Sequence, residues 1–191
     1  KLIKIDKVDN QPISERISET IKSLIKKEKC DVIIFSDFRH GVFNKTSIKS
    51  FSAAIKKNVL RVADSQVASR WGNIIDFKNF DLITPNEKEV RFSLADQDSS
   101  ISELTRKLMK VSGFKNLILK LGERGTVTVA KKNSLSFATP SFARNIVDAV
   151  GAGDALLAYA SLCLVLTKSI VPANILGSIA AACECEMEGN I

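Results

Sequence analysis

The chain has 191 residues, of which 45% are hydrophobic, and it carries a formal net charge of +7 at pH 7. This length and apolar content suit one domain with a real core. The longest apolar run, residues 155–166, excludes a membrane span, because a bilayer needs roughly 20 residues. The lysines lie in scattered pairs without interleaved aromatic residues, which favours a solvated surface that attracts phosphorylated ligands over a nucleic-acid-binding surface. No secretion signal is visible, so we expect a cytoplasmic protein.

The first half of the chain alternates strand and helix patterns. Asp37 and Asp64 each follow a buried strand, at the end where open α/β sheets bind ligands. A binding role is therefore predicted for both, although Asp37 would also suit a loop cap. The predicted elements are a strand at 2–5, a helix that begins at Pro12, strands at 30–36 and 59–63, and a helix at 46–57 between them.

The second half continues this alternation after an irregular segment that contains Trp71, which we interpret as a packing residue. Ser100 and Glu103 form a capping-box pattern that opens a helix, and Gly113 ends it. The repeated strand–helix units predict a three-layer α/β fold: a mostly parallel sheet, helices on both faces and a small β-hairpin. The further elements expected are strands at 80–84, 117–121, 126–130 and 135–138, and helices at 87–94, at 155–166 and from Pro172 onward.

Residues 148–154, with the sequence DAVGAGD, run directly into the apolar helix at 155–166. Small residues before a helix allow a tight turn, and the free N–H groups and dipole of the helix start favour an anion. Asp154, in the first turn, would be stabilised as its anion there and could accept a proton from a hydroxyl. An anion site beside a base is the apparatus of phosphoryl transfer. The alternative is a glycine-rich turn in which Asp154 is an ordinary helix-start residue.

Three motifs together carry a family resemblance. DAVGAGD with its apolar helix resembles the signature of the ribokinase-like (PfkB-type) carbohydrate kinases. Upstream, Asn86 to Glu89 resembles the N-x-x-E motif of that family, and Gly122 to Gly125 resembles its nucleotide-loop G-x-x-G. The motifs occur in the family's order. Within the family, SDFRHG at 36–41 and the strand that ends at Asp64 most resemble the heptose-7-phosphate kinase domain of ADP-heptose synthase.

The resemblance implies a kinase that transfers the γ-phosphoryl group of ATP to a sugar or sugar-phosphate hydroxyl, with heptose 7-phosphate among the acceptors. Asp154 would accept the proton of that hydroxyl. Asn86 and Glu89 would organise Mg²⁺ and the phosphates, Glu89 through water. The backbone N–H groups of one turn would hold the charge of the transferred phosphoryl group. This turn comprises Gly151, Ala152, Gly153 and Asp154.

The resemblance also implies binding roles for other positions. The nucleotide would be contacted by a loop and by a polar residue near adenine, and the acceptor by the two aspartates at the strand ends. A monovalent cation, such as K⁺, would lie beside the turn before the helix. The residues concerned are Lys120, Gly122, Gly125 and Ser178 for the nucleotide, Asp37 and Asp64 for the substrate, and Asp148 and Val150 for the cation.

Several positions keep a plain structural interpretation or depart from the family pattern. Asn86 and Glu89 would also suit a helix cap with a capping box, and the loop glycines would suit a hairpin alone. Lys120 stands where the family often has threonine, and it could contact phosphate or point to solvent. Ala149 replaces the usual threonine, and Gln66 replaces a lysine that heptose kinases tend to have, which weakens the heptose assignment.

The resemblance covers nearly the whole chain but not the N-terminal lid and substrate lobe of the family domain. We therefore expect residues 1–191 to be the C-terminal nucleotide-binding portion of a sugar-kinase domain. Its expected partners are a nucleotide, a sugar or sugar phosphate, and a second copy in a homodimer of the full-length protein. Two other hypotheses remain: a nucleotide-binding module without kinase activity, and a basic nucleic-acid-binding domain.

Overall fold

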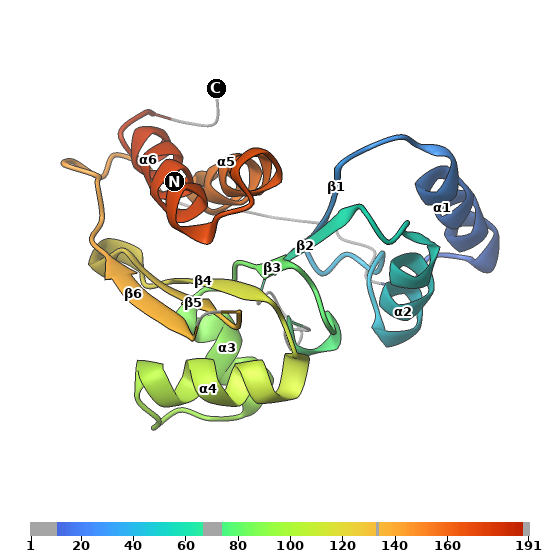
Figure 1. Ribbon diagram of the computed structural model, residues 1–191, viewed down its shortest axis with the longest axis horizontal. Helices are drawn as coiled ribbons and strands as arrows, with labels where there is room; N and C mark the ends of the chain where they lie inside the picture. Colours follow the sequence, from blue (N-terminus) through green and yellow to red (C-terminus); the bar gives the residue numbers. More distant parts are fainter. Residues whose placement is uncertain (1–10, 67–73, 133, 189–191) are drawn as a thin grey trace.

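One sheet of six strands, ordered as they follow along the chain, organises the fold (Figure 1). The computed structural model describes residues 11–66, 74–132 and 134–188, so the predicted strand at 2–5 and Trp71 lie outside the described residues. The strands are β1 (Val32–Asp37), β2 (Leu60–Ser65), β3 (Leu82–Ile83), β4 (Asn116–Lys120), β5 (Thr126–Ala130) and β6 (Leu135–Thr139). The helices are α1 (Glu15–Lys27), α2 (Lys45–Ala54), α3 (Glu87–Leu94), α4 (Ile101–Ser112), α5 (Ala152–Thr167) and α6 (Ile170–Cys185), with short 3-10 turns η1 (Ile74–Asp76) and η2 (Gly122–Arg124).

The direction of strand pairing changes at β4. The pairs β1–β2, β2–β3 and β3–β4 are parallel, whereas β4–β5 and β5–β6 are antiparallel. The predicted parallel sheet with an antiparallel hairpin is therefore confirmed. Because β1 to β4 run in one direction, their carboxyl ends meet at one edge of the sheet, which is where ligands bind in open α/β folds.

The helix ends follow local signals in the sequence. Ser100 caps α4 by accepting a hydrogen bond from the N–H of Glu103, and Gly113 ends it with a φ of +67°. The α5 helix begins at Ala152, three residues before the predicted start, because Gly151 takes a φ of +92° and turns the chain directly into the helix. Likewise, α6 begins before Pro172, which lies in the first turn, where a missing N–H is tolerated.

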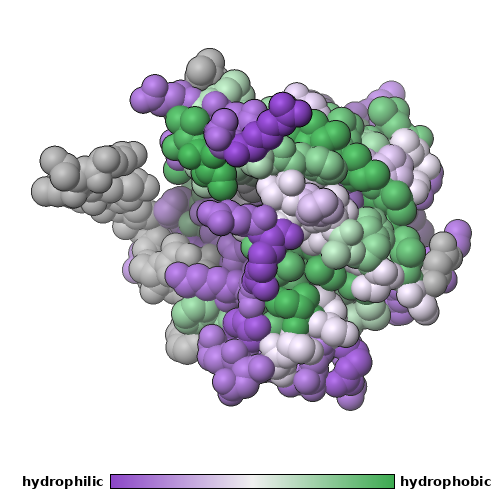
Figure 2. Space-filling model, turned by 90° about the vertical axis from the view of Figure 1, so that its left-hand side faces the viewer, coloured by the Kyte–Doolittle hydropathy of each residue, from purple (hydrophilic) through white to green (hydrophobic). Residues whose placement is uncertain are grey.

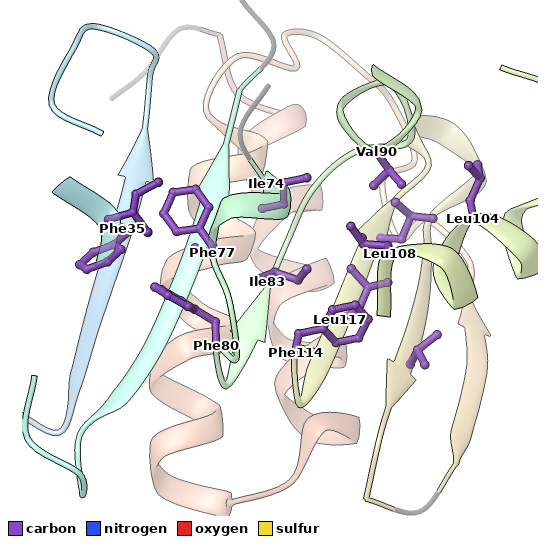
Figure 3. Packing of buried hydrophobic residues seen from close by; sticks show 14 of the residues in the cluster. Phe35, Ile74, Phe77, Phe80, Ile83, Val90, Leu104, Leu108, Phe114 and Leu117 are labelled. Atoms are coloured by element: carbon purple, nitrogen blue, oxygen red, sulfur yellow. The ribbon is translucent and has the colours of Figure 1, made fainter. Parts of the chain in front are cut away.

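The larger core lies between the sheet and the layer that contains α2, α3 and α4. Phe35 of β1 packs against Phe77 and Phe80, with ring centroids 6.0 and 5.3 Å away. Figure 3 shows these rings beside one another near β1 and β2, and Leu104 and Leu108 of α4 toward β4. Burial of such large side chains is the main favourable term in folding.

A second core lies on the opposite face, where α5 and α6 cover the sheet (Figure 1). Val62, Leu82 and Ile118 come from three adjacent strands and pack with Leu156 and Leu157 of α5. Neighbouring residues of the same strands point into the first core, as the alternation along a strand requires. The two cores confirm the three-layer arrangement.

The outer sides of α5 and α6 are apolar as well. Leu166 is 82% exposed, and six further hydrophobic residues of the two helices are exposed. Figure 2 shows hydrophobic side chains that reach the surface mainly in the upper part of the molecule, where Figure 1 places α5 and α6. No helix of the described residues is both long enough and apolar enough to cross a membrane. The other exposed side chains of this face are Tyr159, Leu162, Val171, Ile175, Leu176 and Ile179.

Candidate active site

A cleft of about 1020 Å³ opens at the carboxyl ends of the parallel strands, between the start of α5, the loop before β5 and the last turns of α6. Its walls come from segments far apart in the sequence, so the fold alone brings them together. Apolar residues from α6 and from the segment before α5 line one part, and charged residues from the strand ends line another. The predicted site residues that line it are Asp64, Asn86, Glu89, Lys120, Gly122, Gly125, Val150, Gly151, Ala152, Gly153, Asp154 and Ser178.

The turn before α5 is held by backbone contacts rather than by a side-chain cap. The N–H groups of Val147 and Asp148 donate to the carbonyl oxygen of Cys185 at the end of α6, at 2.8 and 3.2 Å. The Asp148 carboxylate accepts a hydrogen bond from the N–H of Val150 at 3.0 Å. Among the described residues, no side chain caps the first turn of α5. The helix start therefore presents its N–H groups to the cleft, which suits an anion.

Asp154 lies in this first turn, and burial raises the pKa of its carboxyl. The negative charge of Asp64 raises the pKa further, whereas the positive charge of Lys120 lowers it. The sequence expectation took only the helix start into account, whereas burial and a second carboxylate act on this group in the opposite direction. A carboxylate with a raised pKa is a stronger base, which favours proton acceptance.

Lys120 and Asp64 form an ion pair inside the cleft. The Lys120 Nζ lies 2.8 Å from Asp64 Oδ2, and both side chains are largely buried. Asp64 Oδ1 is also buried and has no hydrogen-bond partner among the described residues. The same Nζ would lie 3.3 Å from a Cβ built on Gly153, so the amine rests beside the start of α5. The structure thus places Lys120 between the sheet and the turn before α5, not in open solvent.

Asn86 and Glu89 form the helix cap that the sequence left open as an alternative. The Asn86 side chain accepts a hydrogen bond from the N–H of Glu89 at 2.8 Å, and the Glu89 carboxylate accepts from the N–H of Asn86 at 2.7 Å. This reciprocal capping box starts α3. Glu89 also lines the cleft, and its second carboxylate oxygen accepts a hydrogen bond from Asn86 Nδ2 at 2.7 Å, so Asn86 contacts both oxygens of this buried carboxylate. A contribution to Mg²⁺ binding remains a prediction for both residues.

The two glycines of the η2 loop are required for different reasons. Gly125 has φ +81° and ψ −130°, and a Cβ there would lie 2.1 Å from the carbonyl oxygen of Thr139. Gly122 has φ +62°, but a Cβ there would meet no atom within 4 Å. An ion pair between Arg124 and Glu87 ties the loop to the start of α3. The glycines therefore shape the loop through their own backbone, whatever it binds.

A buried polar network joins this loop to α6. Asn174 Oδ1 accepts a hydrogen bond from Thr126 Oγ1 at 3.0 Å, and Asn174 Nδ2 donates to Thr139 Oγ1 at 2.8 Å. Ser178 Oγ donates to the same Asn174 oxygen at 3.4 Å. Since Thr126 and Ser178 both line the cleft, the network fixes the distance between its two walls.

Asp37 does not line the cleft, contrary to the prediction. Its carboxylate is buried and accepts hydrogen bonds from the Arg39 N–H at 2.8 Å and from Ser65 Oγ at 2.9 Å, beside an ion pair with the Arg39 guanidinium. It therefore holds the loop after β1, which was its alternative interpretation. The side chains of this loop that line the cleft are those of Phe38 and His40. Asp37 and Phe38 thus face different surroundings, and no local pattern in the sequence predicts which of them lines the cleft.

Asp148 and Val150 lie at the rim rather than inside. Asp148 is outside the cleft lining, and Val150 lines it with 62% of its surface exposed. Backbone carbonyl and carboxylate oxygens of this turn have the chemistry that a monovalent cation prefers, and the assignment stays a prediction. The described residues contain no cluster of three histidine, cysteine or acidic side chains that would suit a metal ion.

A family model described as "pfkB family carbohydrate kinase" matches residues 12–191. Among curated proteins, the chain is 25% identical over 186 residues to the bifunctional protein HldE of Geobacter metallireducens and 24% identical over 188 residues to HldE of Helicobacter pylori. Both matches cover 95% of this chain but only 37% and 39% of the relative, so the chain spans less than half of their length.

Solved structures resemble the chain over most of its length. Phosphofructokinase-2 from Escherichia coli, in its tetrameric inhibited form, matches 91% of this chain and 58% of its own at a TM-score of 0.77 and 15% identity. Ribokinase from Arabidopsis thaliana, complexed with ribose and ATP, matches 94% of this chain and 55% of its own at a TM-score of 0.71 and 20% identity. These likenesses show the fold that the chain adopts.

Proposed function

Because the chain belongs to the pfkB family of carbohydrate kinases, we propose that it provides the nucleotide-binding and catalytic part of an ATP-dependent sugar kinase. The observation that carries this proposal is the position of Asp154. Its carboxylate lies at the uncapped start of α5, in the cleft that the η2 loop and Asn86 also line. A base and an anion-binding turn thus meet in a space that is open to a nucleotide.

In the proposed reaction, the oxygen of the acceptor hydroxyl forms a bond to the γ-phosphorus of ATP. The bond from that phosphorus to the bridging oxygen breaks, and ADP leaves with the electron pair. Asp154 takes the proton of the hydroxyl. The N–H groups at the start of α5 donate to the oxygens of the moving phosphoryl group, where positioning and electrostatics supply most of the rate.

The residues of the cleft suit ATP and Mg²⁺. Ala181 and Ala182 of α6, with Ile146, provide apolar surface for a flat base, and Ser178 adds a hydroxyl beside them. Bound Mg²⁺ would neutralise phosphate charge, and in this proposal the buried carboxylate of Glu89 would hold it through water. Lys120 supplies a cation next to the anion-binding turn.

For the acceptor we propose a sugar phosphate, with heptose 7-phosphate as the first compound to test. Two observations support this choice: the resemblance of SDFRHG at 36–41 to heptose kinases, and the similarity of the chain to the bifunctional HldE proteins. Phe38 and His40 of this segment line the cleft. We further propose that sequence outside residues 1–191 completes the acceptor site. The exposed apolar sides of α5 and α6 support such a covering lobe.

The test is a phosphoryl-transfer assay on the full-length protein and its Asp154→Asn variant, with ATP, Mg²⁺ and a panel of sugars that includes heptose 7-phosphate. We expect turnover in the wild type and a loss of roughly 10²–10⁴-fold in the variant, the usual contribution of a general base. Equal rates in the two proteins would remove Asp154 from the mechanism. ATP binding without turnover on any sugar would favour an inactive nucleotide-binding module. Salt-sensitive binding to DNA or RNA with no ATP binding would favour a nucleic-acid-binding domain.

A further inference from the structure

Lys120, Asp64 and Asp154 form a group of three charges with one cation between two carboxylates. Lys120 comes from the end of β4 and Asp64 from the end of β2, and the parallel sheet brings the two strand ends to the same edge. The backbone N–H of Lys120 donates to the carbonyl oxygen of Pro85 at 2.9 Å, which fixes the strand end beside Asn86. The base of the Lys120 side chain is therefore held rigidly, while its amine reaches across the cleft.

The amine is shared between two neighbours of different kinds. On one side it binds Asp64 Oδ2 at 2.8 Å. On the other side it lies 3.3 Å from the position of a Cβ on Gly153, so the absence of a side chain at Gly153 leaves room for it at the start of α5. Lysine carries three N–H donors, so a phosphate oxygen at the turn could bind the amine while Asp64 keeps or releases it.

Asp64 has the features of a residue that positions this lysine. It is 5% exposed, and only its Oδ2 is engaged; the buried Oδ1 has no partner among the described residues. A buried carboxylate without full pairing is costly, so it persists where a ligand or a role compensates for it. Pairing with Asp64 keeps the Lys120 amine from swinging into solvent before a ligand arrives.

We propose that Lys120 and Asp64 form an exchangeable ion pair: Asp64 holds Lys120 beside the anion-binding turn, and Lys120 moves onto the γ-phosphoryl group when the nucleotide binds. Asp64 is then a positioning residue whose freed carboxylate faces the acceptor. This inference rests on the proposed kinase function and adds to it the group that recognises the third phosphate. The exchange also removes a counter-charge from Asp64 at the moment when Asp154 must accept a proton.

The binding test compares Mg²⁺ complexes of a non-hydrolysable ATP analogue and of ADP by calorimetry, without an acceptor. We expect Lys120→Met to weaken the triphosphate by about 10–100-fold, as for one lost charged hydrogen bond, and ADP much less. The matched control is Lys115→Met, because Lys115 pairs with Asp81 at 2.6 Å just before β4, at the opposite end of that strand from the cleft. It should change neither affinity. The double variant Asp64→Asn/Lys120→Met leaves no buried charge unpaired, and it should show the same loss if the single variant folds poorly.

A second readout needs no ligand. In the free protein, an NMR titration of Asp154 should show its pKa rise in Lys120→Met and fall in Asp64→Asn, because these neighbours act on it in opposite directions. This readout tests whether both charges act on Asp154, and the calorimetry tests the exchange. The other titratable groups that line the cleft are Glu89, Glu123, His40 and Cys185, and these variants replace none of them.

The outcomes separate this inference from the function on which it rests. A wild-type protein that binds neither nucleotide would refute the proposed function. Two results would refute the exchange in a wild-type protein that binds both the ATP analogue and ADP. In one, Lys120→Met weakens the two nucleotides equally; in the other, it weakens the ATP analogue no more than Lys115→Met does. An Asp154 pKa that is indifferent to both substitutions would likewise refute the charge group.

Discussion

Replacement of Gly125 by alanine tests whether the η2 loop is shaped by its own backbone. The residue has φ +81° and ψ −130°, a region that is nearly restricted to glycine, so any side chain costs about 1–3 kcal/mol in strain. The new Cβ would also lie 2.1 Å from the Thr139 oxygen, with two further backbone atoms at 2.6 Å. Overpacking of this kind costs typically 1–3 kcal/mol more, so we expect a total loss of about 2–6 kcal/mol in the free energy of unfolding.

Gly122→Ala in the same loop is the matched control. It also has a positive φ but no atom near the new Cβ, so only about 1–2 kcal/mol of backbone strain is expected. For a chain of this size each kcal/mol lowers Tm by roughly 2–4 °C, so thermal unfolding separates the two variants readily. Nucleotide affinity should fall in Gly125→Ala because the loop must shift. Equal Tm values for the two variants would show that a Cβ at position 125 does not clash with the Thr139 oxygen, and would refute this explanation.

Three further changes probe other parts of the structure. Asp154→Asn should raise Tm at pH 7, since partial desolvation and the nearby Asp64 raise the pKa of this carboxyl and its ionised form therefore opposes folding. The gain should vanish as pH falls through that pKa toward about 4, and a gain that persists there would contradict the assignment. Gly177→Ala places a Cβ 2.9 Å from the Leu156 oxygen, so the separation of α5 and α6 must increase. Calorimetry should show a loss of about 1–3 kcal/mol in the free energy of unfolding, and an unchanged Tm would show that the helices can part freely. Asp37→Ala leaves the Arg39 guanidinium buried and unpaired, which should cost about 3–5 kcal/mol; an unchanged Tm with a raised KM for the acceptor would instead make Asp37 a substrate residue.

Features with local signals could be predicted from the sequence. The Ser100 cap, the Gly113 helix end and the strand–helix alternation depend on residues a few positions apart, and the structure has them where the sequence places them. The same holds for the capping box of Asn86 and Glu89, which was the structural interpretation of that motif. Such signals act through short-range hydrogen bonds and backbone preferences, so they remain readable without tertiary context.

Features that depend on distant residues could not be predicted. The pKa of Asp154 moves opposite to the helix-dipole expectation because Asp64, 90 residues earlier, and burial both act on it. The sequence left open whether Lys120 contacts phosphate or points to solvent. Its amine instead binds Asp64, which lies 56 residues earlier in the chain. Asp37 pairs in register with Ser65 on the neighbouring strand, which draws its carboxylate inward. In each case the deciding contact is made by the sheet, not by the local sequence.

The position of the turn before α5 depends on the second core more than on the larger one. The turn begins α5, whereas Lys120 and Asp64 stand on the sheet, so the α5–sheet contact sets their separation. Leu156 is the residue of that contact nearest to Asp154: it packs with the strand residues of the second core and also lines the cleft. A smaller side chain at Leu156 should therefore change the distance between Asp154 and Lys120. A substitution that removes the same volume from the larger core, at Phe35, should lower stability and leave that distance unchanged.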